Sequence, residues 1–375
     1  MSISINSNFD AGSIVVHDVS NPQNIRLGIR NDTNSEFAQW FYFQINGIQS
    51  QQLSIHFENL ATTAYPEGWS NYNLCASYDN QNWFRLPCSF ENNTLSCTFN
   101  CSSNSIYLAY FEPYSYQKHQ ELIGFANLHE ICEHTILGYT AQQRPIDLLT
   151  IGKQDAQYKI WIIARQHPGE TMAEWFMDGL IKRLFDKQDP ISHALLSNCK
   201  FNLVPNMNPD GAILGNLRTN SCGVNLNREW LVPTIENSPE VFYVREKMLS
   251  DTVDMFFDIH GDEALPYVFT SGCADNQSFS QKQQQLEDAF EHIFQLVNPD
   301  YQTEYGYPKN HFSVESSSVA TKWVGNHFDC LAYTLELPFK DNANNPNIKY
   351  GWNGYRSQLL GQDLLTAIHY ILKHN

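Results

Sequence analysis

The chain has 375 residues, with 42% hydrophobic and 17% charged side chains and a formal net charge of -17 at pH 7. This composition indicates a globular protein long enough for two domains and argues against a disordered chain. The acidic charge argues against nucleic acid and anionic membranes as partners, because phosphate binding requires clustered Lys and Arg.

The first residues and the cysteines predict a cytoplasmic protein. Residues 1–13 lack the basic region and apolar core of a secretory signal, and no apolar run approaches the roughly 20 residues that span a bilayer. The nine cysteines are odd in number and scattered, which fits reduced thiols. Nothing in the sequence indicates an oligomeric state.

Residues 1–118 are predicted to form an antiparallel β-sandwich. Short segments rich in aromatic and β-branched residues alternate with clusters of Asn, Gly, Asp and Ser, and no helical periodicity interrupts them. The expected strands lie within residues 39–48, 51–60, 82–90, 95–101 and 105–116.

Residues 119–375 are predicted to form an α/β domain with a mixed, largely parallel sheet. Continuous apolar segments, typical of buried strands, alternate here with segments of helical periodicity. The expected strands lie within residues 158–164, 199–204, 253–261 and 330–339, and the expected helices within 171–185, 238–251, 280–297 and 354–375.

Three residues at the ends of two predicted strands form a candidate metal site. His167 and Glu170 follow the apolar strand 158–164, and His260 ends another. Two histidines and one carboxylate leave a position open for water, the usual composition of a catalytic zinc site. Taken alone, His260 is better explained as a hydrogen-bonded histidine at a turn.

Two carboxylates accompany these candidate ligands. Asp258 lies two residues before His260, so both side chains can share one face of a strand, where the carboxylate would orient the imidazole. Glu336 stands between two leucines in an apolar strand. Burial there would raise its pKa toward that of a general base, although a structural ion pair is the alternative.

Arg218, Asn227 and Arg228 form a polar cluster between the two strands that carry the candidate ligands. The planar guanidinium group suits a carboxylate or a developing oxyanion, although surface salt bridges are the simpler explanation. The segment "HEICEH" at 129–134 is not expected to bind zinc, because its histidines are five residues apart and not four.

Taken together, these motifs resemble the zinc metallocarboxypeptidases of the pancreatic type. The chain carries "HPGE" from His167, "NPDG" from Asn208, "GNLR" ending at Arg218, Asn227-Arg228, a strand-terminal His260 and a late Glu336, in the order of that family. The first half is similar to the N-terminal β-sandwich domain of cytosolic carboxypeptidases. "DIHGDEALPYVF" from Asp258 resembles their short bacterial branch.

The resemblance implies a role for each matching residue. His167, Glu170 and His260 would bind one Zn²⁺ per chain, and Glu336 would be the general base. Arg218 would polarise the scissile carbonyl, and Asn227 and Arg228 would hold the terminal carboxylate of a peptide or protein substrate. These roles describe an enzyme that hydrolyses the C-terminal peptide bond.

The chain departs from the family pattern at two places. Members of the pancreatic type carry a tyrosine whose position falls at Val314 here if Trp323 matches their conserved tryptophan, and the nearest tyrosines are Tyr305 and Tyr307. Many eukaryotic relatives read His-Gly-His where this chain has Asp262 after His260-Gly261. The catalytic tyrosine is therefore unassigned, and the tubulin-tail substrates of those relatives are not carried over.

The resemblance also suggests a substrate class. Cytosolic carboxypeptidases remove C-terminal glutamates, and Lys322 lies beside Trp323 in the stretch that lines their side-chain pocket, which indicates a preference for acidic (Glu) C-termini. The alternative is a zinc amidohydrolase of the aspartoacylase or succinylglutamate desuccinylase type acting on N-acyl amino acids. A third possibility is a binding protein with a vestigial zinc site.

Overall fold

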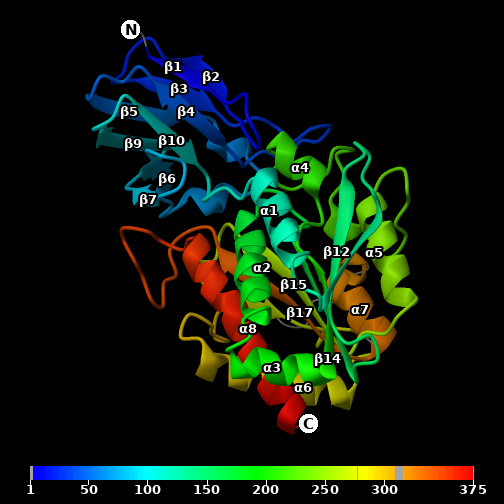
Figure 1. Cartoon of the computed structure of the whole chain (residues 1–375). Helices are drawn as coiled ribbons and strands as arrows, with labels where there is room; N and C mark the ends of the chain where they lie inside the picture. The colour runs from blue at the N-terminus through cyan, green and yellow to red at the C-terminus, as the bar shows by residue number, and fades with distance from the viewer. Residues whose placement is uncertain (1–2, 277, 309–315, 375) are drawn as a thin grey trace.

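The computed structural model describes residues 3–276, 278–308 and 316–374, which form a strand-rich N-terminal part and a larger α/β part (Figure 1). The predicted fold class, a β-sandwich followed by a carboxypeptidase-like α/β domain with a mixed sheet, is confirmed. The last strand of the first part ends at Ala109, and helix α1 begins at Tyr116. The predicted boundary after residue 118 lies within this helix and remains a prediction.

The N-terminal part contains two five-stranded sheets. One has the order β1 (Ser4–Asn6), β4 (Tyr42–Asn46), β10 (Ser105–Ala109), β6 (Leu74–Ser77) and β7 (Trp83–Leu86), with all pairs antiparallel. The other has the order β2 (Val15–Asp18), β3 (Ile25–Gly28), β5 (Gln52–Phe57), β9 (Thr94–Asn100) and β8 (Ser89–Glu91). One pair departs from the antiparallel expectation: β3 and β5 are parallel, because the chain crosses to the other sheet as β4 between them.

Alternating apolar residues hold these two sheets together. On β5, Leu53, Ile55 and Phe57 are fully buried, while the residues between them are at least partly exposed. The rings of Phe43 on β4 and Phe57 lie with centroids 6.2 Å apart, so the two sheets share one core. Two short 3₁₀ helices follow β5, η1 (Leu60–Thr62) and η2 (Pro66–Trp69).

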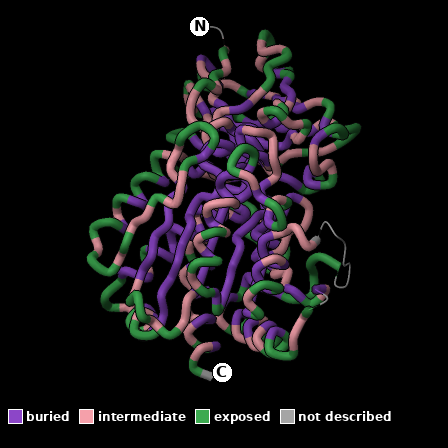
Figure 2. Tube along the Cα trace, turned by 90° about the vertical axis from the view of Figure 1, so that its right-hand side faces the viewer, coloured by how far each residue is buried: buried purple, intermediate pink, exposed green. Residues whose placement is uncertain are grey.

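The α/β part is built on a seven-stranded sheet. Its order is β11 (Cys132–Tyr139), β12 (Pro145–Gly152), β14 (Cys199–Val204), β13 (Tyr158–Ala164), β15 (Met255–Asp262), β17 (Leu331–Pro338) and β16 (Phe269–Ser271). The four central strands, from β14 to β17, are mutually parallel, and the outer ones are antiparallel. Apart from the first two residues of β13, the parallel strands are buried along their length, which explains their largely apolar sequences (Figure 2).

Helices cover both faces of this sheet. Ile160 and Ile162 of β13 belong to the apolar core beneath α2 (Thr171–Leu184), α6 (Gln281–Val297) and α8 (Gly354–His374). The intervening Trp161 and Ile163 belong to the core beneath α5 (Pro239–Leu249) and α7 (Ala320–Phe328). The remaining helices are α1 (Tyr116–Ala126), α3 (Pro190–Asn198), α4 (Pro209–Leu214), η3 (Leu226–Arg228) and η4 (Ser316–Ser318).

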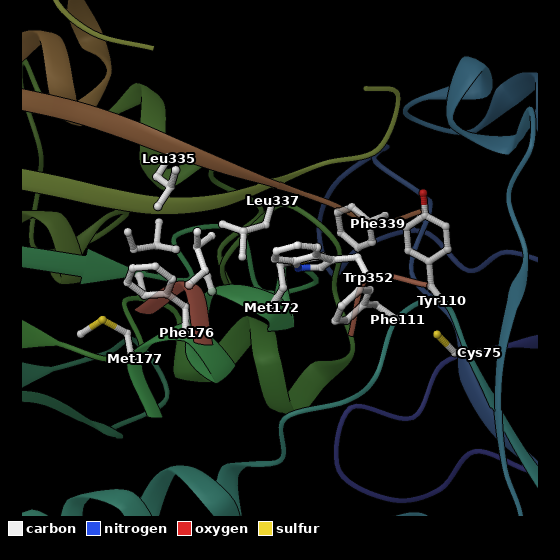
Figure 3. Packing of buried hydrophobic residues seen from close by; sticks show 14 of the residues in the cluster. Cys75, Tyr110, Phe111, Met172, Phe176, Met177, Leu335, Leu337, Phe339 and Trp352 are labelled. Carbon is white, nitrogen blue, oxygen red and sulfur yellow. The ribbon is translucent and has the colours of Figure 1, made fainter. Parts of the chain in front are cut away.

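An aromatic contact joins the N-terminal part to the end of strand β17. Phe339, just beyond the end of β17, packs against the rings of Tyr110 and Phe111, with centroid distances of 4.7 and 5.9 Å (Figure 3). All three side chains are fully buried. The core of the first part therefore continues into that of the second.

Three strands of the large sheet were not expected from the sequence: β11, β12 and the short edge strand β16. Strand β11 contains the end of the "HEICEH" segment, so His134 lies on a strand and contacts Asp147 through Nε2. In strand β12, Asp147 and Thr150 interrupt the apolar sequence, so the segment does not show the continuous apolar run of a buried strand. Over the described ranges of the chain, no helix is both long and apolar enough to cross a membrane.

Candidate metal centre and active site

His167, Glu170 and His260 converge at the C-terminal ends of β13 and β15, as the sequence predicts. His167 Nδ1 lies 2.7 Å from Glu170 Oε1, and His260 Nδ1 lies 2.8 Å from Glu170 Oε2. All three side chains are buried, and their potential ligand atoms lie within 4.8 Å of one another. This is the one group of His, Cys, Asp and Glu side chains in the described part of the chain that could hold a metal ion.

The donor set fits a zinc ion because both imidazoles are held by their other nitrogen. His167 Nε2 lies 3.0 Å from Asn225 Oδ1, and His260 Nε2 lies 2.9 Å from Asp258 Oδ2. A proton on Nε2 that is donated to these oxygens leaves the Nδ1 lone pair directed into the site. The expected orientation of His260 by Asp258 is thus present in the geometry.

The surroundings shift the pKa values of the two histidines in opposite directions. Burial lowers the pKa of His167 to about 4, and Arg218 acts in the same direction against the opposing effect of Glu170, so this imidazole is neutral. Burial also acts to lower the pKa of His260, but Asp258 and Glu170 outweigh it and raise that pKa well above its ordinary value. A neutral imidazole and an anionic Glu170 are the states in which these groups bind zinc.

Glu336 lies beside this group on the neighbouring strand. Its Cα is paired with that of His260 across the parallel strands β15 and β17. Burial raises the pKa of Glu336 to about 8, the negative charges of Glu170 and Asp262 add to this effect, and His260 and Tyr307 oppose it. Oε2 is buried and has no hydrogen-bond partner in the described part of the chain, so it is available to a proton.

Arg218, Asn227 and Arg228 line the same cavity of about 660 Å³ as the candidate ligands and Glu336. Asn227 is fixed by its Oδ1 atom, which accepts a hydrogen bond from the Ala320 N–H at 2.9 Å. Arg228 is exposed, and its Nη1 donates to the carbonyl of Asn227 at 2.7 Å. The three residues come from the loop between α4 and η3 and from η3 itself.

Lys322 lies elsewhere. Its ammonium group forms an ion pair with Asp275 and donates to the Gly272 carbonyl, and it is not among the residues that line the cavity. The sequence placed it near the side-chain pocket because it adjoins Trp323. On α7, however, it points to the loop after β16.

Tyr307 enters the site, whereas Val314 lies outside the described residues. The Tyr307 hydroxyl lies 2.7 Å from Asp262 Oδ2 and 3.1 Å from Glu336 Oε1. The sequence named Tyr307 as one of the two nearest tyrosines but gave it no role.

Several lining residues were not found by sequence reasoning. Asp262 and Glu263 lie two and three residues after His260, at the end of β15, so their position at a strand end was a usable signal. Tyr65 and Glu67 come from η2 and its N-terminal flank in the first part of the chain. No local pattern marks them, because only the contact between the two parts brings them to the cavity.

Comparison with known proteins agrees with this site. Residues 5–111 match the family described as the cytosolic carboxypeptidase N-terminal domain, and residues 122–360 match the zinc carboxypeptidases. A metallo-carboxypeptidase from Burkholderia cenocepacia is 47% identical over the full length of both chains, with a TM-score of 0.98. One from Pseudomonas aeruginosa, solved with (2-guanidinoethylmercapto)succinic acid, is 42% identical over 99% of each chain, with a TM-score of 0.96.

A relative from an animal matches most of this chain at lower identity. Cytosolic carboxypeptidase 6 of Caenorhabditis elegans is 27% identical over 89% of this chain and 78% of its own length. The two matched regions together extend over both the strand-rich part and the α/β part. The chain therefore belongs to the zinc carboxypeptidase family, in the branch with a cytosolic carboxypeptidase N-terminal domain, and is a metallocarboxypeptidase.

Proposed function

We propose that the protein removes single residues from the C-termini of peptides or proteins, with one zinc ion per chain held by His167, Glu170 and His260. The observation that carries this proposal is the position of Glu336, whose free carboxylate oxygen lies in the same cavity as that buried donor set and two arginines. Zinc bound there would supply Lewis-acid activation of a water molecule and of the scissile carbonyl.

Side chains of the protein carry out proton transfer, oxyanion stabilisation and substrate binding. Glu336 accepts the proton of the attacking water and delivers it to the leaving amine. Arg218 stabilises the oxyanion that develops on the carbonyl. Asn227 and Arg228 hold the terminal carboxylate of the substrate, and this restricts cleavage to the last peptide bond.

Replacement of Glu336 tests this assignment. We expect Glu336→Gln to keep the metal content and to lower kcat by roughly 10²–10⁴-fold, because the amide accepts no proton at neutral pH. Metal analysis and initial rates on one peptide give both values. Turnover near that of the wild type would remove Glu336 from the mechanism.

Glu240→Gln is a matched control for that substitution. Glu240 is also buried, its pKa is raised to about 8 by burial, and it lies outside the cavity on α5. We expect this variant to retain wild-type turnover. A comparable loss in both variants would indicate a general effect of removing a buried carboxyl group.

A preference for C-terminal glutamate is the finer part of the proposal. Lys322 is neutralised by Asp275, so the positive charge for an acidic side chain would come from Arg218 and Arg228. Glu67, Asp262 and Glu263 also line the cavity, and their carboxyl groups would disfavour an acidic side chain. The compound with which the Pseudomonas relative was solved carries a guanidino group as well as two carboxyl groups, so it does not favour an acidic over a basic side chain.

Matched peptides that differ only in their last residue test this preference. With Glu, Lys or Phe at the C-terminus, we expect the highest kcat/KM for Glu and a selective loss of that advantage in Arg228→Gln. Faster release of Lys or Phe would contradict the preference while leaving the carboxypeptidase assignment intact.

The zinc amidohydrolase alternative has no support from the comparisons, since residues 122–360 match the zinc carboxypeptidases. An N-acyl amino acid assayed beside the peptides completes the test, and we expect no hydrolysis of it.

A further inference from the structure

The N-terminal part of the chain holds the segment that carries Arg218. A loop between β3 and β4, residues 30–37, lies against residues 214–221 of the α/β part. Two of the bonds between them join the Thr33 N–H to Asn216 Oδ1 (3.0 Å) and Asn34 Nδ2 to the Ser221 carbonyl (3.0 Å).

Asp32 is the centre of this contact. Its side chain is buried, and Oδ1 accepts a hydrogen bond from the Leu217 N–H at 2.6 Å. Oδ2 accepts from the Arg218 N–H at 2.7 Å and from the Thr219 N–H at 3.0 Å. One carboxylate from the first part therefore fixes three consecutive peptide groups around Arg218, and with them the direction of its side chain.

Two aromatic rings from the first part lie against the guanidinium group. The Arg218 Cζ atom is 5.5 Å from the ring centroid of Phe37 and 5.5 Å from that of Tyr65. Both distances are within the range of cation–π attraction. Arg218 lines the cavity, and in the described part of the chain no side chain accepts a hydrogen bond from its guanidinium group.

The same segment also touches the metal-binding loop. The Leu217 carbonyl accepts a hydrogen bond from the Gly169 N–H at 2.8 Å, one residue before Glu170. A side chain at Gly169 would meet the Leu217 Cα at 3.0 Å, so the two backbones approach as closely as glycine allows. Leu217, whose N–H is bound by Asp32, is thus hydrogen-bonded to the residue that precedes the candidate ligand Glu170.

We infer that the N-terminal part completes the active site: Asp32 positions Arg218 through its backbone, and Phe37 and Tyr65 orient its guanidinium group. Asp32 is a positioning residue, because it acts on the substrate only through Arg218. The inference rests on the proposed role of Arg218, and the experiment is designed to separate the two.

A double-mutant cycle in the full-length protein tests the inference. Asp32→Asn loses the negative charge and turns an amide N–H₂ toward backbone donors, so Arg218 shifts. We expect kcat on a C-terminal peptide substrate to fall by roughly 10-fold or more, with a smaller change in KM and with unchanged metal content. In an Arg218→Ala background, which alone lowers kcat, the same substitution should have almost no further effect on kcat.

Arg85→Gln is the control for a general weakening of the contact between the two parts. Arg85 donates to the carbonyls of Phe339 at 2.8 Å and Trp352 at 3.0 Å, away from Arg218. We expect it to lower the thermal midpoint and to leave kcat unchanged in both backgrounds. If Asp32→Asn does not fold, the pair Phe37→Leu and Tyr65→Leu replaces it, with the same dependence on Arg218 expected.

Wild-type kcat in Asp32→Asn, or an equal loss with and without Arg218, would overturn the inference and leave the proposed function standing. Wild-type kcat in Arg218→Ala itself would overturn the proposed role of Arg218 and this inference with it. The inference is supported if Asp32→Asn lowers kcat strongly in the wild type and only slightly in the Arg218→Ala background.

Discussion

At the scale of single residues, a shifted pKa does not by itself identify a catalytic group. Burial raises the pKa of both Glu336 and Glu240 to about 8, and each has one buried oxygen without a partner in the described part of the chain. Only Glu336 lines the cavity that contains the two histidines and Glu170. Geometry therefore decides between the two carboxyl groups.

Asp262 provides a test of how the charge around Glu336 sets its pH dependence. Its negative charge helps to raise the pKa of Glu336, which must be ionised to accept a proton. We expect Asp262→Asn to lower that pKa, so that the acidic limb of kcat/KM moves to lower pH by roughly 1 unit. Rates measured from pH 5 to 9 with the metal bound give the shift.

Asp275→Asn is the control for this pH profile, because Asp275 pairs with Lys322 and is not part of the cavity wall. Its acidic limb should coincide with that of the wild type. An Asp262→Asn profile that is unmoved, or that moves to higher pH, would contradict the electrostatic account of Glu336.

The candidate ligands and the base could be found from the sequence because each lies at or near the end of a strand. Those strands are recognisable as continuous apolar segments. Sequence reasoning gave Lys322 a position that the structure does not support, because neighbourhood in sequence does not fix where a helical side chain points. Tyr307 had no such signal, since the hydrogen bonds that bring it to Glu336 and Asp262 join segments far apart in the chain.

At the scale of elements, a buried ionic network supports the loop that carries the candidate ligands. His119 on α1 lies 2.6 Å from Glu174 on α2 through Nδ1 and 3.0 Å from Asp147 on β12 through Nε2. Glu174 also pairs with Arg165 at 2.6 Å, two residues before His167. Three elements, α1, α2 and β12, therefore meet Arg165 of the metal-binding loop in one network.

The charge of His119 makes this network sensitive to pH. Burial alone would lower its pKa, but Glu174 and Asp147 outweigh burial and raise the pKa to about 9. The stabilisation is therefore complete below the unfolded pKa of about 6.5 and is lost as the pH rises through about 9. We expect His119→Gln to lose ~3 kcal/mol of stability at pH 6 and much less at pH 10.

Thermal midpoints of the wild type and this variant at both pH values measure that difference. His193→Gln, at an exposed position on α3, is the control and should change stability by less than roughly 0.5 kcal/mol. A difference between wild type and His119→Gln that stays constant or grows from pH 6 to pH 10 would refute a charged His119.

The elements that were predicted from the sequence are those whose apolar residues follow one clear pattern, either a continuous run or a helical repeat. The central strands β13, β15 and β17 are continuous and apolar, and helix α2 follows the predicted helical pattern. Strand β11 was missed because it has neither a continuous apolar run nor a regular alternation, being only partly buried along its length. The parallel pairing of β3 with β5 depends on the path of the chain between two sheets and has no local signature.

At the scale of the whole molecule, both parts of the chain contribute residues to the cavity and to a shared core. Tyr65 and Glu67 of the first part line the cavity, Asp32 binds the backbone of the Arg218 segment, and Phe339 packs into the aromatic core of the first part. Removal of the N-terminal part would therefore open the cavity as well as expose the core.

The measurement that tests the account most directly is digestion of a peptide library, with and without a chelator, followed by mass spectrometry. We expect products shortened one residue at a time from the C-terminus, no such products after chelation, and recovery when zinc is restored. Peptides with an amidated C-terminus should resist digestion, because Asn227 and Arg228 would have no carboxylate to hold. Internal cleavage, equal digestion of amidated peptides, or activity that persists without metal would contradict the account.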